Sequence, residues 1–236
     1  MCTVSFVKTN DKVIITSNRD ESVIRLNAIH PMEYIVNNKK VIYPKDPKAG
    51  GTWYAIDENG TVLVLLNGAE EKHEYKPPYR KSRGLIVLDV IGNLSPKQYW
   101  DTIELDNIEP FTIVLYQEGQ LYQLRWDGTF KYTNLLDVNK KHIWASSTLY
   151  PKEIRDKRAK LFHAFLDNKE DVSEIEMYHF HRYTEADNPE NGLVINRNDF
   201  LKTLSITQSV LQQNEVKVKH YDLINETEFK MSFQIN

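Results

Sequence analysis

The residue with the greatest chemical potential in this 236-residue chain is Cys2, its single cysteine, which directly follows Met1. If Met1 is removed, Cys2 carries a thiol with a reference pKa of about 8.5 and a free α-amine with a reference pKa of about 7.7–8.0. Together these groups supply a nucleophile and a general base, so one residue could carry out acyl transfer. The alternative is an ordinary buried cysteine that packs as a small hydrophobe.

A run of four polar residues, Asn18-Arg19-Asp20-Glu21, follows a predicted strand over 13–17. The turn at 9–12 predicts a hairpin with a first strand over 3–7, so the polar run returns beside residue 2. There Arg19 could lower the pKa of the Cys2 thiol, and a carboxylate could hold its amine. Neighbours on an extended strand face opposite sides, which makes Glu21 an alternative partner of Arg19. A solvated turn with a surface ion pair is the other interpretation.

A third candidate is Asn67, which follows a continuous apolar run over 62–66 and precedes Gly68. A side-chain amide at the end of a buried strand can donate a hydrogen bond to a developing oxyanion. Asn-Gly is also a common turn sequence, which is the structural alternative.

The elements that must position these residues are many short strands and a few helices. Helices are predicted over 81–91, after the apparent capping box Ser95-Pro96-Lys97-Gln98, over 151–166 and over 173–181. Strands are predicted over 3–7, 13–17, 52–56, 62–66, 111–116, 120–126, 129–133, 143–146, 201–211, 216–223 and 228–235. Strands at both ends with helices between them indicate an α+β fold with two sheets and outer helices, in one domain over residues 1–236.

Composition excludes several classes of protein. Lys and Arg number 30 against 33 for Asp and Glu, which gives a net charge of -3 and no basic surplus for binding nucleic acid. No stretch approaches the ~18 apolar residues of a membrane helix, and the N-terminus lacks the pattern of a secretory signal. With a single cysteine the fold does not depend on an oxidising compartment. A cytoplasmic location is expected, because no secretory signal is recognised.

The histidines do not form a recognisable metal motif, and none of the seven has zinc-site spacing with cysteines or carboxylates. His179 and His181 would share one face of a strand but not of the helix that is predicted there. The chain also lacks a glycine-rich phosphate loop. No metal and no resident cofactor are therefore expected.

Several short motifs, taken together, resemble the NRDE family, also called the transport and Golgi organisation 2 family. They are Met1-Cys2-Thr3, Asn18-Arg19-Asp20-Glu21, Gly50-Gly51-Thr52-Trp53, Asn59-Gly60, Leu66-Asn67-Gly68 and Ser82-Arg83-Gly84. The resemblance is strong over roughly residues 1–92 and weaker beyond them.

That family is similar to N-terminal nucleophile hydrolases, especially choloylglycine-hydrolase-like amidases, so the resemblance implies an αββα four-layer sandwich. It also implies a set of catalytic positions, which are Cys2, Arg19, Asp20 and Asn67. Glu21 and Trp53 are the candidates for ligand contacts. The amidases usually separate their Arg and Asp, whereas Arg19 and Asp20 are adjacent in this chain.

Two functions follow from the resemblance. The first is hydrolysis of a non-peptide amide by Cys2, with Asn67 assisting the oxyanion. The second is non-enzymatic carriage of haem or another hydrophobic ligand in the same cavity, since family members are also connected with haem handling and with lipid or acyl-CoA homeostasis. The expected partner is thus a small-molecule amide or a haem-like ligand, and the two functions differ in whether Cys2 needs a free amine.

Overall fold

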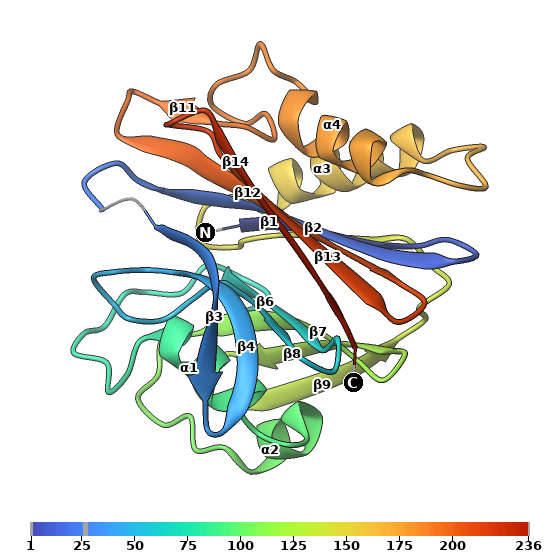
Figure 1. Ribbon diagram of the computed structural model, residues 1–236. Helices are drawn as coiled ribbons and strands as arrows, with labels where there is room; N and C mark the ends of the chain where they lie inside the picture. Colours follow the sequence, from blue (N-terminus) through green and yellow to red (C-terminus); the bar gives the residue numbers. More distant parts are fainter. Residues whose placement is uncertain (1, 26–27, 236) are drawn as a thin grey trace. The chain divides into compact units, whose positions relative to one another are not determined.

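The computed structural model describes residues 2–25 and 28–235, apart from the side chain of Cys2, and the chain divides into two compact units (Figure 1). The first unit contains residues 2–25 and 138–235, and the second contains residues 28–137. Each unit has its own antiparallel seven-stranded sheet and two helices, which confirms the α+β class. The single domain predicted over residues 1–236 stays a prediction.

The sheet of the first unit is built from both ends of the chain. Its strand order is β10-β1-β2-β12-β13-β14, with β11 paired to β12. The strands are β1 (Cys2–Lys8), β2 (Lys12–Ser22), β10 (His142–Ala145), β11 (Asn196–Arg197), β12 (Leu201–Gln212), β13 (Glu215–Asp222) and β14 (Thr227–Gln234). The predicted hairpin of the two N-terminal strands is confirmed, and β2 also pairs along its whole length with β12.

Helices α3 (Lys152–Phe165) and α4 (Glu174–Tyr183) belong to the first unit and contact its sheet. Apolar side chains that alternate along the strands pack against them, and the buried members of this core are Val7, Ile14, Phe162, Leu166, Val172, Met177, Phe180, Leu193 and Val210. The capping box predicted at the start of α4 is confirmed, because Ser173 and Glu176 exchange hydrogen bonds. We call this side of the sheet the helix face.

The second unit is a meander, in which the strands follow one another in sequence order from β3 to β9. They are β3 (Ile29–Val36), β4 (Lys39–Lys45), β5 (Tyr54–Asp57), β6 (Val62–Asn67), β7 (Phe111–Gln117), β8 (Gln120–Trp126) and β9 (Lys131–Leu136). Helix α1 (Arg83–Ile91) contacts β5 and β6, and α2 (Pro96–Thr102) contacts α1 and β7. The apolar run that forms β6 is buried on both faces, as its continuity predicted.

Two local predictions are corrected by the structure. The capping box at Ser95 is wrong, since its side chain accepts no helix hydrogen bond and the Lys97 N–H donates to Oε1 of Gln117 instead (3.1 Å). Strands β3 and β4 were not predicted, because β3 is a largely exposed edge strand that contains a proline and has no clear alternation. Their turn, Asn37-Asn38, has positive φ at both residues, which is a hairpin signal that the sequence did contain.

Among the described residues, no helix is both long enough and apolar enough to cross a membrane.

Candidate active site

The hairpin of the first unit sets Cys2 opposite Arg19 in the β1–β2 register. Directly opposed residues of an antiparallel pair share a face of the sheet, so residues 2 and 19 belong to the same face. Arg19 is buried, with 3 % of its surface exposed. The Cys2 side chain lies outside the part of the chain that the structure describes, so the predicted effect of Arg19 on the Cys2 thiol stays a prediction.

Asp20 lies on the opposite side of β2, on the helix face. Strand β2 is extended as far as Ser22, so the side chains of Arg19 and Asp20 point to opposite faces of the sheet. The Asp20 carboxylate accepts hydrogen bonds from Oγ1 of Thr203 (2.6 Å) and from the hydroxyl of Tyr150 (2.7 Å). Burial raises the pKa of Asp20, and the positive charge of Arg158 and these two hydrogen bonds oppose the increase.

Arg158 on α3 is a buried cation that the hydropathy pattern of this helix did not reveal. Its guanidinium lies over the ring of Tyr150, 3.7 Å from the centroid. It donates hydrogen bonds to Oγ1 of Thr3 and to the carbonyl of Gly192, the latter at 2.5 Å. Because Thr3 follows Cys2 directly, Arg158 ties the first residues of β1 to the helix layer.

His181 on α4 is fully buried and links the helix to both strands of the hairpin. Its Nε2 lies 2.7 Å from Oγ of Ser5, and its Nδ1 is hydrogen-bonded to Oδ1 of Asn18. Asn18 donates its own Nδ2 to the carbonyls of His181 (3.1 Å) and Leu193 (2.7 Å), so its Oδ1 is the acceptor and His181 Nδ1 the donor. Burial and then the charge of Arg158 lower the pKa of His181 to about 3, so the ring is neutral near neutral pH.

His181 connects helix α4 to strands β1 and β2, and we expect its burial to make the stability of the fold decrease in acid. An unfolded histidine binds a proton below about pH 6.5, whereas His181 in the folded chain does so only near pH 3, so stability is lost as the pH falls below 6.5. The free energy of unfolding of the wild type should fall by about 2 kcal/mol more than that of His181→Gln between pH 7.5 and pH 5. Urea unfolding at several pH values measures the two slopes, and groups that titrate in both proteins, Asp20 among them, cancel in the difference. Equal slopes would contradict the assignment.

Among the described residues, His, Cys, Asp and Glu side chains form no group of three or more that could hold a metal ion. The α4 assignment places His179 and His181 on different faces of a helix, as the sequence predicted.

Glu21 is on the same face of β2 as Arg19 and carries a defined set of contacts. Its carboxylate accepts hydrogen bonds from the guanidinium of Arg25 (2.9 Å) and from the backbone N–H of Ser22 (3.0 Å). Burial alone would raise the pKa of Glu21, but the Ser22 N–H and the charges of Arg25 and Arg19 bring it below its ordinary value. Glu21 and Arg19 therefore interact electrostatically on this face of the sheet.

Asn67 is the last residue of β6 in the second unit, opposite Phe111 of β7. The chain turns immediately afterwards at Gly68, whose φ of 86° suits glycine. The Gly68 N–H donates to the carbonyl of Pro110 (3.0 Å), and its own carbonyl accepts from Oγ1 of Thr112 (3.0 Å). These contacts fix the backbone on the C-terminal side of Asn67.

The motifs at 50–53 and 82–84, both in the second unit, contact each other at Gly51 and Gly84. A Cβ on Gly51 would lie 2.4 Å from the carbonyl carbon of Gly84, so the backbones can touch only because residue 51 is glycine. The Thr52 N–H donates to the Gly84 carbonyl (3.2 Å). Trp53 is buried, and its carbonyl accepts from the N–H of Leu65 (2.9 Å), which holds it beside β6.

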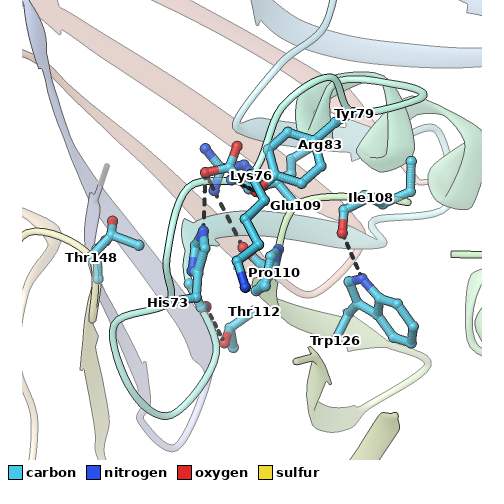
Figure 2. A network of polar contacts seen from close by, with 12 residues as sticks. His73, Lys76, Tyr79, Arg83, Ile108, Glu109, Pro110, Thr112, Trp126 and Thr148 are labelled. Carbon is cyan, nitrogen blue, oxygen red and sulfur yellow. Dashed lines mark hydrogen bonds and ion pairs between the residues drawn. The ribbon is translucent and has the colours of Figure 1, made fainter. Parts of the chain in front are cut away.

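Arg83, in the motif at 82–84, joins the same region to the segment before β7. Its guanidinium lies 3.0 Å from the Glu109 carboxylate and donates to the Pro110 carbonyl at 3.3 Å. His73 completes the cluster at 3.2 Å from Glu109, as Figure 2 shows. Pro110 thus binds both Arg83 and Gly68, which brings the three-residue motifs at 66–68 and 82–84 to one place.

The predicted site residues fall into two groups. Cys2, Arg19, Asp20 and Glu21 lie in the first unit, and Trp53 and Asn67 lie in the second. That the members of both groups line one pocket stays a prediction. The sequence reasoning missed Arg158, Tyr150 and Thr203, the partners of Asp20, because nothing local marks a residue that is more than a hundred positions away in the chain.

The fold is that of the N-terminal nucleophile hydrolases, as three similar solved structures show. Two crystal structures of a conjugated bile acid hydrolase from Clostridium perfringens are similar to this chain. Each alignment covers 100% of this chain and 97% of the hydrolase chain. The cysteine-to-alanine mutant has a TM-score of 0.60 at 11% identity, and an arginine-to-leucine variant has 0.63 at 10%. An N-acylethanolamine-hydrolyzing acid amidase ortholog from Caenorhabditis elegans gives 0.61 at 12% identity, covering 88% of this chain and 92% of that chain.

Within that fold the chain belongs to the Transport and Golgi organisation 2 family, whose sequence profile matches residues 1–221. No curated protein matches the chain significantly in sequence.

Proposed function

We propose that the chain is a cysteine amidase that hydrolyses a non-peptide C–N bond with Cys2 as its nucleophile. The observation that carries this proposal is the register of the β1–β2 hairpin, which sets Cys2 opposite the buried Arg19. The similar solved structures are of a bile acid hydrolase and an acid amidase, and the bile acid hydrolase was crystallised with a cysteine and with an arginine replaced. The same two residue types are paired in this chain.

The proposed reaction begins when the Cys2 α-amine takes the thiol proton and the thiolate attacks the amide carbonyl carbon. The amine then passes the proton to the leaving nitrogen, the C–N bond breaks and a thioester remains on Cys2. Water attacks the thioester, which releases a carboxylic acid and restores the thiol. Arg19 favours the thiolate by its charge, and Asn67 donates to the oxyanion. Removal of Met1 is required, and no metal or organic cofactor takes part.

Asp20 acts from the other face of β2 in this proposal. Its bonds to Tyr150 and Thr203 hold the end of the strand that carries Arg19, so it is a positioning residue. Glu21 shares the face of Arg19 and, together with Trp53, remains the proposed ligand contact. The direct test is release of amine from simple N-acyl amides by the purified chain and by Cys2→Ser.

We expect Arg19→Gln to raise the pKa of the Cys2 thiol by about one unit or more, because an opposite charge within a few ångströms favours the thiolate. Since Cys2 is the only cysteine, the pH dependence of iodoacetamide labelling, followed by intact mass, reports on this thiol alone. Lys8→Gln is the control, because it removes the same charge from the exposed far end of β1, about 20 Å along the strand. An identical labelling profile for wild type and Arg19→Gln would exclude this role.

A further inference from the structure

Small hydroxyl side chains line the face of the first unit's sheet that carries Arg19. In the β2–β12 register, Ser205 lies opposite Arg19 and Thr207 lies opposite Ser17, so these four residues share that face. The residues between them, Asn18 on β2 among them, belong to the helix face. We call Ser17, Ser205 and Thr207 the hydroxyl strip.

Two members of the hydroxyl strip are buried without a hydrogen-bond partner among the described residues. Ser17 is 0 % exposed and Ser205 is 4 % exposed, and neither Oγ atom is hydrogen-bonded. Thr207 differs, because its Oγ1 lies 2.8 Å from Nδ1 of His220. The β1 neighbour of Ser17 is Val4, which offers no polar group. Leaving a buried hydroxyl unsatisfied costs about 1–3 kcal/mol, so two such groups indicate a site that is completed by something else.

Both unsatisfied hydroxyls adjoin Arg19. Ser205 is its direct partner across the strands, at a Cβ separation of about 5 Å, and Ser17 is two residues away on the same strand, about 7 Å. Glu21 on the same face accepts hydrogen bonds from Arg25 and Ser22, and its carboxylate is not a partner of either serine hydroxyl. Two hydroxyl donors beside a guanidinium match a ligand group that only accepts hydrogen bonds and carries negative charge.

We propose that Ser17 and Ser205, together with Arg19, form a subsite that binds a carboxylate group of the ligand. Resting on the proposed function, this inference defines the substrate class: an amide that also carries a carboxylate near the bond to be cleaved. A wholly apolar substrate would leave both hydroxyls unsatisfied.

The test compares the rates at which Cys2 is alkylated by iodoacetate and by iodoacetamide, which are of similar size and differ in the carboxylate. In the wild type, the ratio of the iodoacetate rate to the iodoacetamide rate should be about tenfold above the ratio for N-acetylcysteine, because one charged hydrogen bond is worth at least that factor. In Ser17→Ala/Ser205→Ala the ratio should fall severalfold toward the N-acetylcysteine value, with the remainder due to the charge of Arg19, while the iodoacetamide rate stays within about twofold.

Ser209→Ala is the matched control. Ser209 is a buried serine on the same strand and face, four residues from Ser205 and about 13 Å further along β12, so its loss should leave the ratio unchanged. Removing an unsatisfied hydroxyl is not expected to destabilise the fold, and if the double variant fails to fold, the two single variants should each give an intermediate ratio. A wild-type ratio equal to that of N-acetylcysteine, or one that the serine variants do not change, would overturn the subsite.

The alkylation test can succeed or fail independently of the amide-hydrolysis test, because alkylation of Cys2 needs no amide turnover. A serine-dependent preference for iodoacetate in a chain that hydrolyses no amide would support the subsite and refute the amidase. Amide turnover without that preference would support the amidase and refute the subsite.

Discussion

Replacement of Cys2 by serine is expected to reduce amide hydrolysis by a factor of about 10³ or more, because removing the nucleophile of a covalent mechanism costs at least this much. A hydroxyl is a far poorer nucleophile than a thiolate near neutral pH, and Arg19 cannot compensate for that difference. The fold should be unaffected, since serine and cysteine have nearly the same shape. The measurement is the rate of amine release at saturating amide, with urea unfolding as the check on stability.

Retention of Met1 should be almost as damaging, because the α-amine of Cys2 is then acylated and cannot take the thiol proton. Intact mass shows whether Met1 is present, so the processed and unprocessed chains can be compared directly. A processed chain that hydrolyses amides no faster than Cys2→Ser would refute the nucleophilic role of Cys2.

The same three proteins distinguish the amidase from a carrier. A carrier of haem needs neither the thiolate nor the free amine, so haem titration of wild type, Cys2→Ser and the Met1-retaining chain should give one affinity if haem is the ligand and Cys2 does not touch it. Unchanged haem affinity together with no amide turnover in any of the three would end the hydrolase hypothesis and favour the carrier.

The parts of the fold that could be predicted are those governed by local rules. The turn at 9–12 predicted the hairpin of β1 and β2, and the capping box of Ser173 and Glu176 predicted the start of α4. The alternation of an extended strand also predicted that Arg19 and Asp20 would face opposite sides. Each of these inferences depends on residues within a few positions of one another.

The partners of the site residues could not be predicted because they come from distant positions. A charged residue on a helix is expected to face water, and Arg158 is buried because Thr3, Tyr150 and Asp20 surround it. The polar face of β12 left a clearer signal, since Ser205, Thr207 and Ser209 alternate with other residues along a predicted strand. That pattern marks one polar face, but only the register with β2 shows that it adjoins Arg19.

The largest effect on stability is expected for Arg158→Met, which keeps the length of the side chain but removes its charge and its donors. Asp20 then loses the positive charge that opposes its burial, and Thr3 Oγ1 and the Gly192 carbonyl lose a donor. Removing one partner from a buried pair of charges typically costs about 3–5 kcal/mol. The free energy of unfolding in urea should fall by about that amount.

The reason for this loss can be tested with Asp20→Asn, which removes the buried negative charge. If Arg158 stabilises the fold by compensating Asp20, the double variant Asp20→Asn/Arg158→Met should be more stable than the sum of the two single effects predicts, by about 1 kcal/mol or more. Lys160→Met on the exposed side of α3 is the control and should change stability by no more than about 0.5 kcal/mol. Strict additivity would mean that Arg158 acts only through its hydrogen bonds to the start of β1, and that the charge of Asp20 is balanced without it.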